Sequence, residues 1–372
     1  MRTLFTFFGI LFITFSVAAQ EAYKFTDVID LDTTPVISQG ITGTCWSFST
    51  SSFLESEIIR LNGKQIDVSE MYTVRNTYPK KAENYVMRQG KAQFSQGGLA
   101  HDVLNSVRDY GIVPVASYSG LFGEATQHNH SEMVSTLTAM LETHVKNSKN
   151  LSPKWKESFD ATLDVYLGDN VSEFTYEGKK YTPLQFSEML QIDTDDYVNI
   201  TSFTNAPFYS EFILNIPDNF SNGSFYNVPI GELVNTIDYA LKNGYTVAID
   251  CDVSEKTFSS RDGVAIIPAN SENNKNALQS IYPEKEITQK YRQQEFENFN
   301  TTDDHLMHIT GTVKDQNGAT YYKVKNSWGT NPQHTAYDGY VYFSEAYIRL
   351  KTISITLHGG GVPKGVAEKL KL

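Results

Sequence analysis

The residues with the clearest capacity for chemistry lie in segment 39–48, which reads QGITGTCWSF. Cys45 stands at the expected start of a helix, where free backbone N–H groups and the helix dipole stabilise negative charge. Such a position favours the thiolate and can lower a thiol pKa from about 8.5 to roughly 3.5–7.5. The preceding glycines allow close backbone approach, and the Gln39 amide can donate a hydrogen bond near the sulfur. A lone cysteine is more often a small buried core residue, so the flanking residues carry the functional interpretation.

Segment 39–48 resembles the active-site string of papain-like cysteine peptidases, in which Gln is followed by Gly-x-Cys-Trp, then Ser or Ala, then Phe. Residues 325–329, KNSWG, resemble the family's second string, which carries the asparagine of the catalytic triad. His305 lies between the two strings, so the order cysteine, histidine, asparagine matches. Two such strings in the right order are far rarer by chance than either one alone.

The resemblance implies hydrolysis of peptide bonds through a thioester, without a metal or an organic cofactor. In that scheme the Cys45 thiolate attacks the carbonyl carbon and His305 carries the proton. Asn326 holds the imidazole ring, while the Gln39 side chain and the Cys45 backbone N–H donate to the oxyanion. Trp328 is expected to pack over the hydrogen bond between His305 and Asn326 and to keep water away.

The sequence departs from the papain pattern in two ways, and both indicate one branch of the family. Thr42 stands where papain has a disulfide cysteine, and the triad histidine and asparagine follow the nucleophile by about 260 and 280 residues instead of roughly 130–150. Both departures fit the bleomycin hydrolase and bacterial aminopeptidase C branch, which lacks the disulfides and carries large insertions. The resemblance covers most of 36–115 and 231–357 and is weak over 116–228. Members of this branch are often hexamers, so a homo-oligomer is implied as one arrangement.

Further strings are similar to the same branch: residues 68–72 (VSEMY), Gly97-Gly98 ahead of a helix that ends in YGIVP, and residues 251–254 (CDVS). The branch implies that Gly97 and Gly98 form a backbone edge that pairs with an extended substrate, although two glycines alone are typical of a turn. Trp46, next to the nucleophile, is assigned a supporting role on the same basis. Cys251 stands in a strand-like run and is expected to be structural.

His308 is the alternative to His305 as the triad histidine. Residues three apart on a strand point to opposite faces, so only one of the two is expected to face Cys45. The branch's motif is similar to the string HLM that begins at His305, which favours His305. Asp304, His305 and His308 can also be read as metal ligands. Strand geometry spoils that spacing and no further cluster of ligand types supports it, so we expect no metal.

The periodicity of apolar residues indicates which elements position these groups. Helices are expected over 45–61, 99–110, 132–146, 153–167, 183–190 and 232–242. Strand-like runs follow over 245–251, 305–313, 320–326 and 339–343. A helical half followed by a strand-rich half predicts an α+β protein with its cleft between two lobes. The papain-like resemblance implies that the strand-rich lobe is barrel-like.

The expected organisation has five parts. They are a signal peptide over 1–19, a helical lobe with the nucleophile over 20–115, an inserted and partly helical segment over 116–228, a strand-rich lobe with the histidine and asparagine over 229–357, and a C-terminal tail over 358–372.

The amino terminus indicates export. Arg2 provides the positive charge of a signal peptide, and residues 4–15 form its apolar stretch. Residues 17–19 are small and form a cleavage site before Gln20. The apolar stretch is about 12 residues, whereas a membrane span needs about 20, so a cleaved leader is favoured over an anchor. The mature protein is therefore expected to be periplasmic or secreted, without stable membrane association. Two cysteines allow one disulfide at most, and none if one is a working thiol.

The formal net charge of −12 narrows the class of partner. An acidic surface repels phosphate backbones, so nucleic acid is disfavoured as a partner. Peptide substrates are the partners that the family resemblance implies.

The tail bears on how the substrate would be cut. In the resembling branch the tail enters the cleft, and its carboxylate fixes the substrate amino group, which makes the enzyme an aminopeptidase. Here Pro363 begins an expected short helix with Val366, Ala367 and Leu370 on one face, and the extended arm that follows in the branch is missing. Aminopeptidase action is expected, and an endopeptidase with an open cleft is the alternative. A peptide-binding protein without activity and acyl transfer to an amine are further alternatives, and the intact catalytic set disfavours the binding-only reading.

Overall fold

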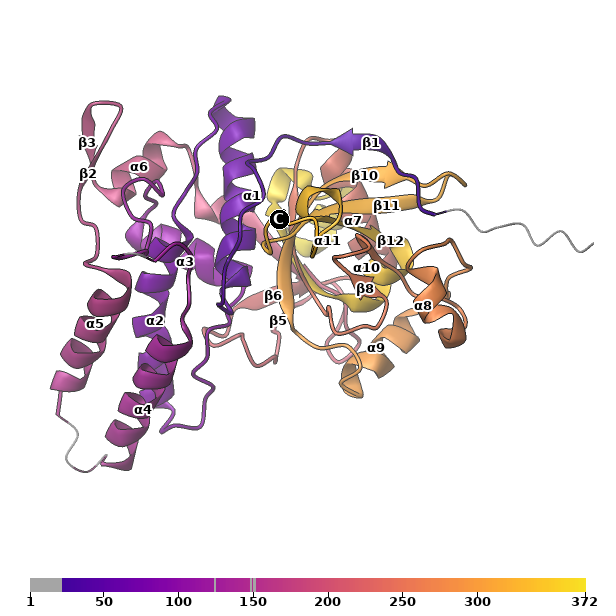
Figure 1. Cartoon of the computed structure of the whole chain (residues 1–372). Helices are drawn as coiled ribbons and strands as arrows, with labels where there is room; N and C mark the ends of the chain where they lie inside the picture. The colour runs from indigo at the N-terminus through magenta and orange to yellow at the C-terminus, as the bar shows by residue number, and fades with distance from the viewer. Residues whose placement is uncertain (1–21, 124, 148, 150–151) are drawn as a thin grey trace, which may run out of the picture.

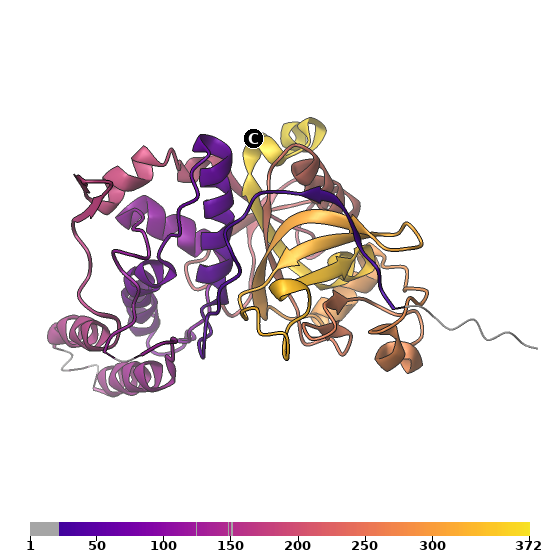
Figure 2. The same ribbon diagram turned by 45° about the horizontal axis from the view of Figure 1, so that its top comes forward.

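The computed structural model describes residues 22–123, 125–147, 149 and 152–372. The leader predicted over residues 1–19 lies outside these ranges. Helices α2–α6 gather on one side, and the large sheet lies on the other side with the later helices around it; helix α1 (Cys45–Asn62) lies between them (Figure 1). Figure 2 shows the same division in a second view. The predicted α+β class, with a helical lobe and a strand-rich lobe, is confirmed.

α1 joins the two lobes. Its carboxyl end is closed by Gly63 at a left-handed φ of 67°, whose N–H donates to the Ile59 carbonyl oxygen at 2.8 Å, as a glycine cap does. The helix packs against α3 (Ala100–Tyr110) in the helical lobe and against strand β10 (His305–Lys314) in the strand-rich lobe. Many of its buried side chains are small and polar, such as Ser47, Ser49 and Ser51, and small side chains allow both lobes to approach the helix closely.

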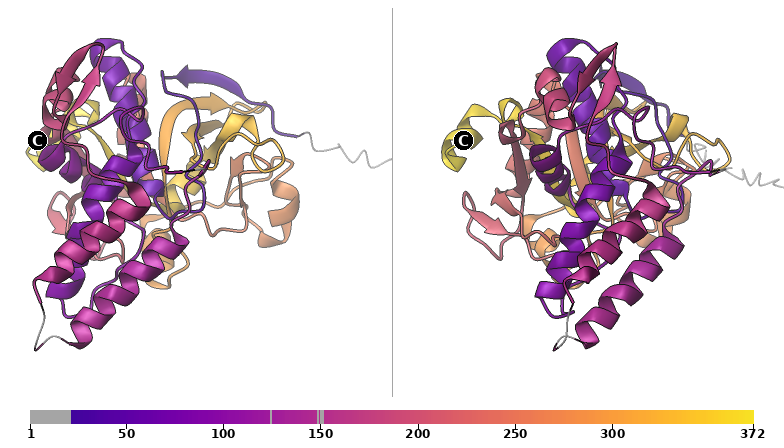
Figure 3. Two further views of the ribbon diagram at one scale, coloured as in Figure 1. Left: turned by 60° about the vertical axis from the view of Figure 1, so that its left-hand side comes forward. Right: turned by 90° about the vertical axis from the view of Figure 1, so that its left-hand side faces the viewer.

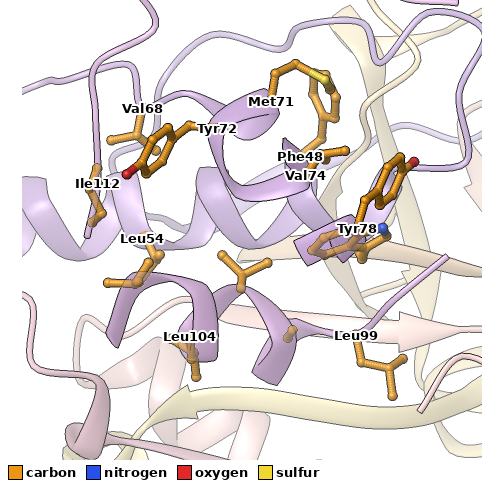
Figure 4. Close-up of a cluster of buried hydrophobic side chains, with 14 of the residues drawn as sticks. Phe48, Leu54, Val68, Met71, Tyr72, Val74, Tyr78, Leu99, Leu104 and Ile112 are labelled. Carbon is orange, nitrogen blue, oxygen red and sulfur yellow. The ribbon is translucent and has the colours of Figure 1, made fainter. Parts of the chain in front are cut away.

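Helix α2 (Glu70–Met87) was not predicted from the sequence. Ser69 caps it, because its Oγ accepts the Tyr72 N–H at 3.0 Å. Pro79 lies inside the helix and several charged residues follow it, so the apolar periodicity is weak. The helix is held by tertiary packing. Figure 4 shows the apolar cluster to which it contributes, with labelled members Phe48, Leu54, Val68, Met71, Tyr72, Val74, Tyr78, Leu99, Leu104 and Ile112.

Segment 116–228 divides between the two lobes. Helices α4 (Ser131–Lys146) and α5 (Lys154–Leu167) lie side by side in Figure 3 and extend the helical lobe. The hairpin of β2 (Phe174–Tyr176) and β3 (Lys179–Tyr181) packs with helix α6 (Pro183–Met189), which contacts α3 in the same lobe. Strands β4 (Tyr197–Thr201), β5 (Glu211–Ile213) and β6 (Ser224–Asn227) instead join the large sheet. The segment expected as one insertion therefore builds parts of both lobes.

The strand-rich lobe is built on an 11-stranded sheet in the order β5-β6-β4-β13-β7-β10-β11-β12-β9-β8, with β1 pairing to β10. The remaining strands are β1 (Thr26–Asp30), β7 (Val247–Cys251), β8 (Phe258–Ser259), β9 (Val264–Ala265), β11 (Thr320–Lys325), β12 (Tyr340–Ser344) and β13 (Thr352–His358). The remaining helices are α7 (Ile230–Lys242), α8 (Asn274–Ala277), α9 (Gln289–Glu297), α10 (Glu345–Lys351) and α11 (Lys364–Leu370). Within the described ranges, every helix is too short or too polar to cross a bilayer.

The tail docks at the far end of α1 from Cys45. Val366 and Leu370 of α11 are buried in the apolar core of the strand-rich lobe, which confirms the predicted docked helix. Before that helix, His358 stacks on Tyr245 with ring centroids 5.1 Å apart, and the guanidinium of Arg60 lies over the same tyrosine. Arg60 belongs to the last turn of α1, so its residue spacing places the start of the tail roughly 22 Å along the helix from Cys45.

Candidate active site

Cys45 is the first residue of α1 and is buried. In the loop before Cys45, the backbone at two glycines lies close to neighbouring segments of the helical lobe. Gly40 has a φ of +66°, and a Cβ on it would lie 2.4 Å from the His128 carbonyl oxygen, so only glycine fits without strain. On the other side of the loop, the Gly43 N–H donates to Oε1 of Gln96 at 2.7 Å. The sharp entry into the helix is therefore fixed by packing and hydrogen bonds from the helical lobe.

Trp46 supports the same entry. Its indole Nε1–H donates to the Gln96 carbonyl oxygen at 2.8 Å, and its ring is fully buried. A Cβ on Gly98 would come within 3.0 Å of that ring, so glycine lets the 97–98 backbone lie flat against it. The structure therefore brings the Gly97-Gly98 edge, expected to pair with substrate, next to the residue that follows Cys45.

His305 and Asn326 meet at the ends of neighbouring strands. His305 is the first residue of β10 and Asn326 directly follows β11. Nε2 of His305 lies 2.8 Å from Oδ1 of Asn326. The Ser327 N–H donates to the same Oδ1 at 2.7 Å, which identifies that atom as the acceptor oxygen. Nε2 therefore carries the proton, and Nδ1 of the ring is left as the basic nitrogen.

Trp328 covers this pair. Its ring lies 4.9 Å from that of His305 between centroids, with an angle of 36° between the planes. Both His305 and Asn326 are almost wholly buried, whereas Trp328 is partly exposed. The indole therefore separates the hydrogen bond from solvent, which is the arrangement that the family resemblance implies.

The segment that carries Gln39 is tied to the segment that carries Asn326. The Gln39 N–H donates to the Ser327 carbonyl oxygen at 2.9 Å, and Ser38 and Trp328 form an antiparallel bridge. Ser327 Oγ also donates to Oε1 of Gln39, which turns the amide so that Nε2 donates to the Thr42 carbonyl oxygen at 2.7 Å. One N–H of that amide remains for a substrate. Ser327 is a functional residue that sequence reasoning missed, although it lies inside the KNSWG string.

The backbone of Leu306, next to His305, links the two lobes at the nucleophile. Burial, the largest influence, raises the pKa of the Cys45 thiol to about 12, and a hydrogen bond from the Leu306 N–H acts in the opposite direction. Burial also lowers the pKa of His305 to about 4, against the opposing effect of Asn326. The expectation of a lowered thiol pKa is therefore wrong, because burial and, after it, the carboxylates of Asp218, Asp303 and Asp250 raise that pKa.

His308, on β10, contacts α1 away from Cys45. Its Nδ1 is 3.0 Å from Oγ of Ser52, two turns along the helix from Cys45. It therefore does contact the helix that carries the nucleophile, but away from the thiol, and it faces the opposite side of β10 from His305. The metal reading of Asp304, His305 and His308 does not fit the geometry, because the two imidazoles point to Asn326 and Ser52.

A second group of acids lies in a cavity of about 200 Å³ between the lobes. Glu55, Asp67 and Glu70 approach closely enough to share a cation. Both carboxylate oxygens of Glu55 already accept hydrogen bonds, from Thr34 Oγ1 and the Val68 N–H. The ammonium of Lys325 adds positive charge to the same cavity, where it acts on Glu55 and Glu70. The group is therefore best described as a buried polar network that joins the lobes.

Comparison with known proteins agrees with this geometry. The sequence model of the Peptidase C1-like family matches residues 160–372, which is more than half of the chain. Aminopeptidase C of Listeria monocytogenes serovar 1/2a is 24% identical over 91% of this chain and 83% of that protein. Mitochondrial cysteine proteinase 1 of Saccharomyces cerevisiae is 22% identical over 94% of this chain and 80% of that protein. The crystal structure of pepw from Lactobacillus rhamnosis HN001 covers 93% of this chain and 84% of that one, with a TM-score of 0.74 at 18% identity, which shows a shared fold.

Proposed function

Because this chain belongs to the Peptidase C1-like family, we propose that it is a cysteine aminopeptidase whose nucleophile is Cys45. The observation that carries the proposal is the His305–Asn326 hydrogen bond of 2.8 Å beside the helix that begins at Cys45. The similarity to aminopeptidase C of Listeria supports action at the amino end of peptides. An endopeptidase is the second candidate, favoured by the docking of the tail away from Cys45.

In the first half of the reaction the thiol proton passes to Nδ1 of His305 as sulfur attacks the peptide carbonyl carbon. The Nε2–H group of His305 keeps its hydrogen bond to Oδ1 of Asn326, so the ring keeps its orientation and the imidazolium is stabilised. The oxyanion accepts from the free N–H of the Gln39 amide and from the Cys45 backbone N–H. The C–N bond then breaks, the imidazolium gives its proton to the leaving amine, and a thioester to Cys45 remains.

In the second half a water molecule replaces the amine. His305 takes a proton from it, and the resulting hydroxide attacks the thioester carbonyl with the same oxyanion donors. The C–S bond breaks, and the thiolate recovers its proton from the imidazolium as the carboxylic acid leaves. His305 is therefore the proton carrier in both halves of the reaction.

The test is hydrolysis of an aminoacyl fluorogenic amide, its N-acetylated form and an internally quenched peptide, each before and after treatment with iodoacetamide. The proposal expects cleavage of the free-amino substrate that alkylation removes. Cleavage of the blocked and internal substrates at similar rates would establish the endopeptidase. If alkylation left the hydrolysis of every substrate unchanged, the thiol mechanism would be contradicted. Transfer of the acyl group to an added amine would reveal a transferase.

We also propose that the protein is exported and begins at Gln20 after removal of the leader. The support is the apolar run and small-residue site before Gln20. Amino-terminal sequencing of protein recovered outside the inner membrane would give Gln20, whereas a chain that still began at Met1 would contradict export.

A further inference from the structure

The loop between β5 and β6, residues 214–223, reaches from the sheet to the helical lobe. Ser221 Oγ donates to the carboxylate of Asp102 on α3 at 2.6 Å. At the end of α2, Arg88 donates to the Asn222 side chain at 3.2 Å. Figure 1 places β5 and β6 between the two lobes. The loop is therefore anchored on both sides and bridges the lobes.

Asp218 in this loop covers the backbone edge at Gly97. A Cβ on Gly97 would lie 1.8 Å from Oδ2 of Asp218, so the carboxylate occupies the space directly above the glycine. Gln93 Nε2 and Ser95 Oγ hold the other oxygen, Oδ1, at 2.9 and 3.4 Å. Oδ2 is thereby turned toward the edge that is expected to pair with substrate.

Two further carboxyl groups lie beside Asp218. Asp250 stands opposite Leu306 in the β7–β10 pair and is only 2% exposed. It shares its face of β7 with Ala248, which packs into the core of the helical lobe, so the carboxylate is aimed between the lobes. The carboxyl groups of Asp250 and Asp303 hydrogen-bond to each other, and burial raises the pKa of both, so they hold a proton between them. Among the described residues, no other donor reaches either oxygen of Asp250 or Oδ2 of Asp303. These buried acceptors have the chemistry to receive a donor from a ligand.

In the described part of the chain, the three carboxyl groups of this cluster lie near a single ammonium group, that of Lys81. Lys81 is almost wholly buried and donates to the Gly97 carbonyl oxygen, and it is the ammonium whose charge acts on Asp218. The backbone N–H of Asp218 points to the carboxyl of Asp303, which joins the two acids into one group. After burial and the Leu306 N–H, the same carboxylates are the further influences on the pKa of Cys45, so the group lies within electrostatic reach of the nucleophile.

We propose that Asp218, with Asp250 and Asp303 beside it, binds the free α-ammonium group of a peptide substrate at the end of the cleft beyond Gly97. The inference rests on the proposed aminopeptidase function and names the residues that would impose it. An α-ammonium has three donors, and the carboxyl oxygens of Asp218, Asp250 and Asp303 are the acceptors that the group offers to them. An N-acetylated peptide brings no charge and would place its acyl group against the carboxylate above Gly97.

The experiment compares wild type with Asp218→Asn, which keeps the size of the side chain and removes its charge. Asp195→Asn is the matched control, because Asp195 is exposed on the short 3₁₀ turn Thr194–Asp196, outside the site. Steady-state constants are measured for an aminoacyl fluorogenic amide with its amine free and with its amine acetylated. We expect Asp218→Asn to lower kcat/KM for the free-amino substrate by about 10- to 100-fold, mainly through KM, and to leave the acetylated substrate unchanged. The control variant should match wild type on both.

A binding measurement separates this inference from the proposed function. Leucinamide should slow iodoacetamide labelling of Cys45 in wild type, N-acetyl-leucinamide should not, and Asp218→Asn should abolish the protection. Asp250→Asn provides a second variant with the same expectation if the first does not fold. Equal losses on both substrates, or no change on either, would overturn the ammonium site. If wild type cleaves blocked peptides freely while leucinamide still protects Cys45 through Asp218, the aminopeptidase proposal fails and the amine site stands.

Discussion

Replacing Ser327 by alanine tests whether the oxyanion amide is held in place from the other lobe. The hydroxyl of Ser327 donates to Oε1 of Gln39, and both residues are buried at 6% exposure. The substitution removes that hydrogen bond but keeps the backbone link from the Gln39 N–H to the Ser327 carbonyl oxygen. A hydrogen bond between neutral groups contributes about 0.5–1.5 kcal/mol, which converts to a roughly 2- to 13-fold fall in kcat/KM. Removing the amide itself sets the upper limit, at about 10²–10³.

The effect should appear in kcat with little change in KM, because the amide acts on charge that develops only in the transition state. A double-mutant cycle gives the decisive comparison: in a Gln39→Ala background, Ser327→Ala should cost nothing further. Ser56→Ala is the matched control, because Ser56 on α1 also loses a buried hydroxyl hydrogen bond, to the Asp32 carbonyl oxygen, without contact to the oxyanion group. Wild-type kcat/KM in Ser327→Ala, or the same loss in both backgrounds, would refute the reasoning.

Three other predictions concern the triad and the pH dependence of stability. Cys45→Ala should abolish hydrolysis in a folded protein and Cys251→Ala should not; iodoacetamide that labelled Cys251 alone and removed activity would contradict this. His305→Ala should remove activity, whereas His308→Ala should mainly lower the melting temperature; complete loss in both folded variants would undo the assignment. Burial raises the pKa of Glu284 to about 7 from 4.5, so the proton it binds favours the folded state, and stability falls as pH rises from about 4.5 to 7. Glu284→Gln should remove up to about 3 kcal/mol of that fall, measured as the free energy of unfolding at pH 5 and pH 8, and an unchanged slope would count against it.

The sequence predicted the elements that carry strong local signals. Helix α1 was bounded correctly because Gly63 ends it and large apolar residues mark its faces. Strands β7 and β10 were found because their residues are apolar or β-branched along nearly their whole length. Helix α2 was missed because its buried residues include charged and amide side chains such as Lys81 and Asn76, whose burial depends on tertiary partners. The short strands β4–β6 were missed because three to five residues give too little periodicity to separate from loop.

In the candidate site, too, some residues carry a local sequence signal and others are brought in only by the fold. The sequence predicted Cys45, His305 and Asn326 as the triad because short strings surround them. It could not identify Asp218, which comes from a loop without a motif and reaches Gly97 only through the fold. The thiol pKa was predicted wrongly for a related reason. A helix start is visible in sequence, but burial of the sulfur and the approach of distant carboxylates are properties of the folded chain.

The tail provides the last prediction, because two different segments could fix the substrate amino group. Residues 358–372 dock at the far end of α1, where Val366 and Leu370 are buried in the strand-rich core. Deleting 366–372 should therefore lower the free energy of unfolding by about 3–5 kcal/mol, the loss expected for two buried apolar side chains. It should leave the ratio of kcat/KM for free and acetylated substrates within about twofold, because the carboxylates proposed to set that ratio stay in place. The double variant Val366→Ala, Leu370→Ala loosens the same contact without shortening the chain and should behave alike. If a folded truncated protein gained activity on the acetylated substrate, the tail and not the loop of Asp218 would limit the cleft.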